Sequence, residues 1–143
     1  MTDGATTWLF KEEPTHYGYD ALERDRRTTW TGVKNPLAQK YLARVRKGDR
    51  ILYYHTGKEK AIVGIATAVS DAYPDPDGAA KGFVVDVAPR RRLDRPLTLA
   101  EIKARPAFAE FALVRMPRLS VMPVPERELQ ELQDLAPGAG LDA

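Results

Sequence analysis

The chain has 143 residues, 43% of them hydrophobic, and a formal net charge of +2, which suits one globular domain with a substantial core. It contains no cysteine and only two histidines, His16 and His55, which excludes disulfides and argues against a histidine-built metal site. No apolar run approaches the roughly 20 residues that span a bilayer, and the start, MTDGATTWLF, lacks a signal-peptide pattern. We therefore expect one cytoplasmic domain over residues 1–143, with no membrane, metal or cofactor and a tail frayed from about residue 137.

The first predicted elements are short. Residues 7–11, TWLFK, are rich in aromatic and β-branched types and predict a strand. A proline and a glycine interrupt residues 12–19, which we expect to form a loop. Asp20 can then cap a short helix that begins at Ala21.

A helix is predicted over residues 36–46, directly after the stretch 29-TWTGVK-34. Asn35 is a good N-cap, Pro36 holds the favoured first helical position, and Gly48 ends the helix. One face is apolar and the other is basic. The apolar face consists of Leu37, Ala38, Tyr41, Leu42 and Val45, and the basic face of Lys40, Arg44 and Lys47.

Strand patterns dominate the middle of the chain. Residues 50–55 and 61–69 predict two strands, joined by a hairpin-length loop that contains Gly57. The turn-rich segment 70–82 precedes a third strand over residues 83–89.

The last third of the chain combines helices with one more strand. Thr98 and Glu101 form a capping-box pattern for a helix that stops near residue 105, because a proline follows. Residues 118–124 predict a final strand, and Pro125 opens a final helix. Because strands and helices mix without regular βαβ alternation, we expect an α+β fold with a curved, mostly antiparallel sheet flanked by helices.

Basic residues are unevenly distributed. Residues 24–50 hold nine Lys and Arg against two Asp, a local charge of about +7 that leaves about −5 for the remainder. A second cluster is 90-RRRLDR-95. Two interpretations stay open: a solvated surface, or the electrostatic footprint of a polyanion.

Catalytic signatures are weak. The chain carries no GxGxxG, P-loop or GxSxG motif. Glu12 and Glu13 are adjacent, so their side chains point apart and make a poor acid/base pair. His55, at the end of a predicted strand, could act as a general base, but a partly buried, hydrogen-bonded role is favoured.

Seven stretches, each weak alone, form a recognisable series over nearly the whole chain. They are 8-WLFKEEP-14, 30-WTGVKNPLAQKYL-42, 47-KGDRILYYHTG-57, 61-AIVGIATAV-69, 84-VVDV-87, 97-LTLAEIKARP-106 and 118-RLSVMPV-124. Together they resemble the EVE domain, a family of the PUA-like superfamily that is distantly related to YTH domains. The resemblance implies a PUA-like pseudo-β-barrel of about five strands flanked by helices. It also implies a non-catalytic module that recognises a modified base of DNA or RNA in a pocket beside a basic surface.

The resemblance places Trp30 in this pocket, where stacking on a base contributes roughly 1–3 kcal/mol; the alternative is a core tryptophan. Asn35 matches the motif asparagine, whose amide suits a Watson–Crick edge unless it is used to cap the helix. Lys34 stands where the family usually has arginine, and since lysine lacks a planar fork we expect it to contact phosphate.

Lys11 and Glu13 match the family's opening motif, in which Glu12 stands where a small hydroxyl residue is common. Glu13 could accept a hydrogen bond from an exocyclic amine, or it could organise the loop.

Three further pocket candidates, Tyr54, His55 and Ser120, match segments that lie beside the pocket in the family. Because side chains alternate along a strand, only one of Tyr53 and Tyr54 should face it. The residues expected to contact phosphate are Lys40, Arg44, Lys47, Arg26 and Arg27.

The chain departs from the family at Gly82, where a tryptophan is common. Either Phe83 replaces that ring or the aromatic cage has one wall. Two other functions fit the same residues: a hydrolase of modified nucleosides that uses Glu13, Lys11 and His55, and a regulatory domain that binds a small metabolite.

Overall fold

A computed structural model describes residues 5–77 and 82–141. In chain order the elements are β1 (Thr7–Glu12), α1 (Pro14–Tyr17), α2 (Tyr19–Asp25), β2 (Thr28–Trp30), α3 (Pro36–Leu42), β3 (Arg50–His55), β4 (Ala61–Ala68), β5 (Tyr73–Pro74), β6 (Phe83–Thr98), α4 (Leu99–Lys103), the 3-10 helix η1 (Pro106–Phe108), α5 (Ala112–Arg115), β7 (Val121–Pro123) and α6 (Glu126–Leu135). Among the described residues, no helix is long and apolar enough to cross a membrane.

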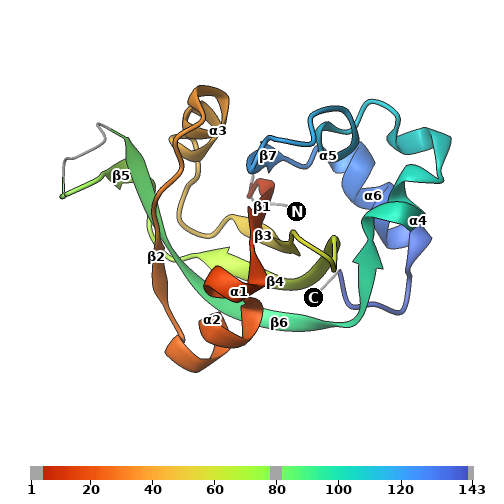
Figure 1. Ribbon diagram of the computed structural model, residues 1–143, viewed down its shortest axis with the longest axis horizontal. Coiled ribbons are helices and arrows are strands. Elements are labelled where there is room, and N and C mark those ends of the chain that lie inside the picture. Colours follow the sequence, from red (N-terminus) through yellow and green to blue (C-terminus); the bar gives the residue numbers. More distant parts are fainter. Residues whose placement is uncertain (1–4, 78–81, 142–143) are drawn as a thin grey trace.

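The strands form one curled sheet in the order β2-β6-β4-β3-β1-β7, with β5 paired to β6. Of the strand pairs formed by the described residues, β1 and β3 run parallel and the others are antiparallel. Figure 1 shows β6 sweeping along the sheet from β5 to α4, with α3 at one side and α4, α5 and α6 together at the other. The expected α+β pseudo-β-barrel flanked by helices is confirmed, with seven strands among the described residues where about five were expected.

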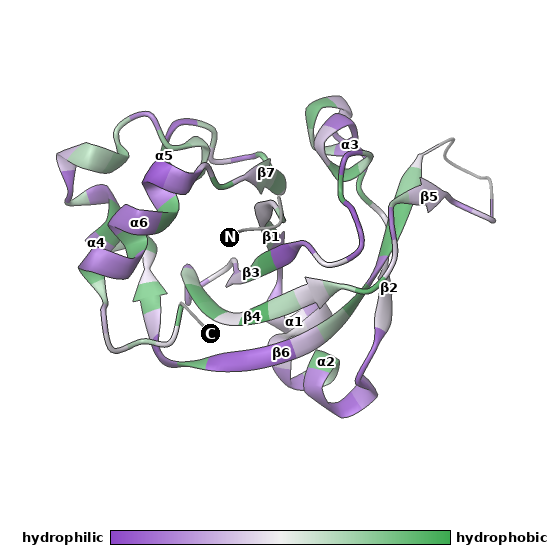
Figure 2. Cartoon of the chain, turned by 180° about the vertical axis from the view of Figure 1, so that it is seen from behind, coloured by the Kyte–Doolittle hydropathy of each residue, from purple (hydrophilic) through white to green (hydrophobic). Residues whose placement is uncertain are grey.

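Strand β6 is much longer than the predicted strand 83–89, because it continues to Thr98. Proline cannot donate to a ladder and is tolerated at irregularities. Pro89 sits opposite Ala66, where the β4–β6 register shifts, so it does not end the strand. Figure 2 shows the consequence: the basic cluster 90–95 forms a hydrophilic stretch in the middle of β6, which pairs with the more hydrophobic strand β4.

Two predicted helix boundaries were wrong. Helix α3 ends at Leu42 and does not reach residue 46, because the following turn bonds elsewhere: Arg46 N–H donates to the Asp49 carboxylate and Gly48 N–H donates to Ala68 O. Gly48 then adopts a left-handed φ of 95°. Helix α2 begins at Tyr19 with Gly18 as its N-cap, so Asp20 lies inside the first turn, where its charge favours the positive end of the helix dipole.

The C-terminal segment is packed against the fold as far as residue 141, whereas a tail frayed from about residue 137 was expected. Ala139 and Leu141 are buried. Their carbonyl oxygens accept hydrogen bonds from Asp94 N–H at 2.8 Å and from the Arg50 guanidinium at 3.0 Å. These bonds tie the segment to β6 and β3.

Candidate nucleic-acid interface

Trp30 closes β2 and pairs with Val85 of β6. Its side chain is only 6% exposed. The indole lies 5.2 Å from the Phe10 ring and 5.4 Å, edge to face, from the Tyr53 ring, measured between centroids. Trp30 is therefore part of the core, and only a small portion of the residue is open to a ligand.

A hollow of about 170 Å³ lies against that exposed portion. It is lined by Glu12, His16, Tyr17, Thr28, Thr29, Trp30 and Thr31. The hollow thus joins the end of β1 to β2 and combines an indole with hydroxyls and one carboxylate. Glu12 was expected only as a departure from the family motif, yet its side chain lines this hollow, which Glu13 does not.

Glu12 lies on the same face of β1 as Phe10, because alternate residues of a strand share a face. One carboxylate oxygen accepts the Glu13 N–H at 3.1 Å, and the other lies 3.0 Å from Nδ1 of His16. Burial, followed by the negative charge of Glu12, raises the pKa of Tyr53 above its ordinary value. The hydroxyl of Tyr53 donates to the backbone oxygen of Tyr17, a residue that lines the hollow, at 2.5 Å.

Lys11, Tyr54 and Ser120 are brought together away from this hollow. Lys11 lies 5.6 Å above the Tyr54 ring, and its ammonium donates to Pro117 O at 2.8 Å. The Lys11 N–H donates to Ser120 O at 2.9 Å. Burial lowers the pKa of Lys11. Of the two neighbouring tyrosines, Tyr53 is therefore the one that faces Trp30, and Tyr54 packs on the opposite face of the sheet.

Glu13 and His55 have structural partners outside the hollow. The Glu13 carboxylate accepts a hydrogen bond from the Thr56 hydroxyl at 3.4 Å. His55 Nε2 accepts the Tyr19 N–H at 3.0 Å, so its proton lies on Nδ1, which is 2.7 Å from the Glu59 carboxylate. His55 is 7% exposed. His55 is therefore hydrogen-bonded, as expected, and more deeply buried than the expected partly buried state.

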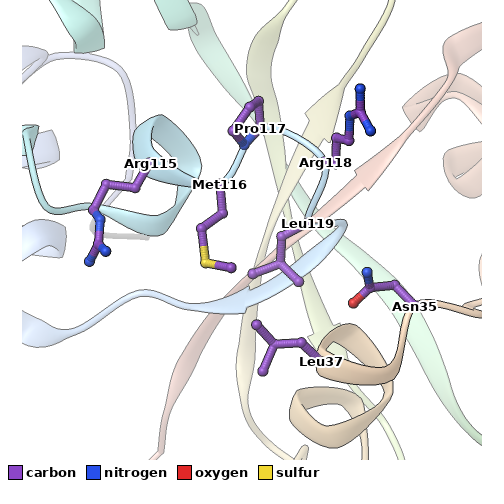
Figure 3. Close-up of a pocket in the computed structure, with 7 residues that line it drawn as sticks. All are labelled: Asn35, Leu37, Arg115, Met116, Pro117, Arg118 and Leu119. Carbon is purple, nitrogen blue, oxygen red and sulfur yellow. The ribbon is translucent and has the colours of Figure 1, made fainter.

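Asn35 caps helix α3 as predicted, because its Oδ1 accepts the Ala38 N–H at 2.9 Å. The same residue lines a groove of about 370 Å³, whose other walls are Leu37, Arg115, Met116, Pro117, Arg118 and Leu119. Figure 3 shows Leu37, Met116 and Leu119 converging at its centre, with the two arginines extending away from it on either side. With Oδ1 used for capping, the Asn35 amide offers this groove its NH2 donor.

The expected phosphate-contacting residues are all exposed: Lys40, Arg44, Lys47, Arg26 and Arg27, together with Lys34. Arg27 forms an ion pair with Asp86 at 3.2 Å. Arg26 ends α2 in a left-handed conformation, with φ of 66°. Figure 1 shows β2 running between α2 and α3, so basic residues flank the strand of Trp30 at both ends.

The second basic cluster is largely neutralised within the fold. Arg92 pairs with Asp20 and with Glu23. Arg91 pairs with Asp94, and Arg95 with Glu101, in the same part of the fold. This stretch of β6 therefore serves to fasten α2 and α4 to the sheet, and it is a weak polyanion footprint.

Phe83 does not replace the missing ring of Gly82 as a second wall for Trp30: in the described part of the chain it makes no ring contact with that tryptophan. Its backbone is held by the Gln39 amide, which accepts from Phe83 N–H at 2.8 Å and donates to Phe83 O at 3.2 Å. The ring is 37% exposed.

Asp86 of β6 was not singled out from the sequence, yet it positions β2. Its carboxylate accepts hydrogen bonds from Tyr73 at 2.7 Å, Thr29 at 2.9 Å and Arg27 at 3.2 Å. Burial raises the pKa of Asp86, but these three donors outweigh it and hold the pKa below the ordinary value of 3.8.

The Asp86→Asn variant is expected to be less stable at neutral pH by about 1 kcal/mol, since an amide accepts these bonds more weakly. A carboxyl whose folded pKa is depressed stabilises the fold above its unfolded pKa, and this contribution is lost as pH falls through the folded value. Urea unfolding at pH 7 and at pH 3 should therefore show the difference between wild type and variant shrinking in acid. A difference independent of pH would contradict this role.

Three comparisons bear on identity. The family model described as EVE domain matches residues 6–135. A solution structure of a Rhodopseudomonas palustris protein is 38% identical with a TM-score of 0.86, covering 93% of this chain and 94% of that one. Human THYN1, solved in complex with 5-methylcytosine-containing DNA, is 26% identical with a TM-score of 0.82, over 92% and 97% of the two chains.

Full-length relatives are longer than this chain. Thymocyte nuclear protein 1 of Gallus gallus is 29% identical over 156 aligned residues, which cover 85% of this chain but only 64% of the chicken protein. The family match extends over most of the sheet and both helical flanks described above. The chain therefore belongs to the EVE domain family.

Proposed function

We propose that this chain is a non-catalytic nucleic-acid-binding module that receives a modified base at the Trp30 hollow, with 5-methylcytosine in DNA as the first ligand to test. The observation that carries the proposal is the hollow itself, which places an indole beside hydroxyls and a carboxylate between β1 and β2. The DNA complex of human THYN1, which shares the fold, supports the choice of ligand.

The basic residues support a nucleic acid as the partner. Lys34 follows Trp30 closely, and Lys40 and Arg44 lie on or just after α3. A nucleic-acid backbone attracts such exposed cations without regard to sequence, whereas base contacts provide specificity. We assign Lys40 and Arg44 to the backbone and Trp30 to the base.

A hydrolase is less well supported. Its three candidate groups do not converge, because Lys11 contacts Tyr54 and Pro117, Glu13 contacts Thr56, and His55 is bonded to Tyr19 and Glu59. We therefore propose no catalytic role for them.

The test is a titration at low salt with matched oligonucleotides that carry cytosine or 5-methylcytosine, as single- and double-stranded DNA and as RNA. We expect tighter binding of methylated DNA. Lys40→Ala and Arg44→Ala should weaken all oligonucleotides alike and each reduce the slope of log K against log salt by about 1.

The control variant is Lys103→Ala, an exposed lysine in the last turn of α4. It should leave both affinity and salt slope unchanged. Equal affinity for methylated and unmethylated oligonucleotides in every form would refute base recognition. Equal salt slopes in all three variants would refute the assignment of the α3 cations.

A further inference from the structure

The Trp30 hollow contains an acidic group that the proposed function does not yet use. Among the described residues that line it, only Glu12 is acidic. Its side chain is 24% exposed and lies on the strand face that carries Phe10 towards Trp30. A carboxylate at this position does not favour phosphate, so its presence needs another explanation in a module for polyanions.

Glu12 still has unused hydrogen-bonding capacity. An ionised carboxylate offers about four acceptor sites and no donor. One oxygen accepts the Glu13 N–H and the other pairs with His16 Nδ1, which leaves an acceptor site on each oxygen. A ligand in the hollow therefore meets a wall that accepts hydrogen bonds and donates none through this side chain.

Bases differ in whether their exocyclic substituent donates or accepts a hydrogen bond. Cytosine N4 and adenine N6 are amino donors, whereas thymine and uracil carry a carbonyl oxygen at the corresponding position. A carboxylate accepts a strong, charge-assisted bond from an amino group and repels a carbonyl oxygen.

We propose that Glu12 makes the Trp30 hollow selective for bases that carry an exocyclic amino group, and against bases that carry a carbonyl at that position. This inference rests on the proposed function, because it assumes that a base enters the hollow. It assigns the choice of base class to one residue, separately from the stacking by Trp30 and from the phosphate contacts.

A variant of His16 can separate two roles of Glu12, the selection of a base and the support of the His16 ring. The His16 ring is exposed and contacts the Glu12 carboxylate, so Glu12 could serve only to hold this histidine. Replacing His16 by alanine removes that contact but leaves the carboxylate in the hollow. Because His16 also lines the hollow, His16→Ala is expected to lower the affinity for every oligonucleotide alike. The ratio of affinities for 5-methylcytosine and thymine should survive His16→Ala and disappear in Glu12→Gln.

The experiment uses one oligonucleotide with a single variable position: 5-methylcytosine, thymine, 5-methylpyrimidin-2-one or an abasic site. The first three keep the methyl group and differ in the substituent at ring position 4. We expect wild type and His16→Ala to bind 5-methylcytosine about 10-fold or more tightly than thymine, with the unsubstituted ring between them. In Glu12→Gln, whose amide can also donate, the ratio should fall to about 2-fold or less.

Each outcome decides something. Equal binding of 5-methylcytosine and thymine by wild type, or an unchanged ratio in Glu12→Gln, overturns the role of Glu12. If a base is still preferred to the abasic site and this preference requires Trp30, the proposed function is retained and only the role of Glu12 is rejected. If all four oligonucleotides bind alike, the proposed function and the inference both fail. Thermal melting of each variant confirms that it is folded.

Discussion

Replacing Asp49 by alanine is expected to lower the free energy of unfolding by about 3–5 kcal/mol, or roughly 10 °C in melting temperature. Asp49 is 4% exposed. Its carboxylate accepts the indole N–H of Trp8 at 2.8 Å and the backbone N–H groups of Thr6 and Arg46 at 3.0 Å each. Truncation leaves these donors without their acceptor, in surroundings where water replaces it poorly.

The matched control is Asp71→Ala. Asp71 also accepts a backbone N–H, from Lys47 at 2.9 Å, but this bond is exposed. Because water can replace the Asp71 carboxylate as acceptor, we expect Asp71→Ala to lower the free energy of unfolding by less than about 1 kcal/mol. Urea unfolding followed by circular dichroism measures both variants, and comparable losses would show that burial does not set the cost at Asp49.

Replacing Trp30 is expected to affect stability and binding together. Trp30→Ala should cost about 3–5 kcal/mol of stability, because a buried indole in contact with Phe10 and Tyr53 leaves a cavity. Trp30→Leu fills more of that cavity but has no π-face. It should lose the preference for 5-methylcytosine and about 10-fold or more in affinity, whereas Trp30→Phe should keep part of both.

The other tryptophan separates the two effects. Trp8 is as buried as Trp30 but lies away from the hollow, against Tyr41. Trp8→Leu should be destabilised to a similar degree and keep its base preference in isothermal titration. In fluorescence titrations, the signal of bound DNA should persist in Trp8→Leu and vanish in Trp30→Leu. A similar loss of preference in both variants would mean that stability, and not stacking, explains the effect.

The local signals in the sequence were reliable where the chemistry is local. The Asn35 cap and the Thr98–Glu101 capping box are both present, because each joins groups three residues apart. The strands over residues 50–55 and 61–68 also match their predictions. The seven EVE-like stretches correctly indicated the family and its half-barrel.

The face of a strand was harder to infer. Strand β3 is buried on both sides, so its hydropathy does not alternate and does not reveal which tyrosine faces β2. Contacts with Trp30 from β2 and Lys11 from β1 decide that Tyr53 lies towards the hollow and Tyr54 away from it. Alternation along β1 puts Glu12 at the hollow, whereas Glu13, which follows the strand as the N-cap of α1, lies outside it.

The sequence alone therefore determined the fold class, the family, the helix caps and the presence of Trp30 beside a basic segment. Tertiary structure decided which residues share the hollow, why Asp49 and Asp86 matter, and why Arg91, Arg92 and Arg95 of β6 are paired. The physical reason is separation along the chain: Asp49 meets Trp8 across 41 residues, Asp86 meets Thr29 across 57, and Arg92 meets Glu23 across 69. Such partners are chosen by strand pairing and curvature, which no short window of sequence contains.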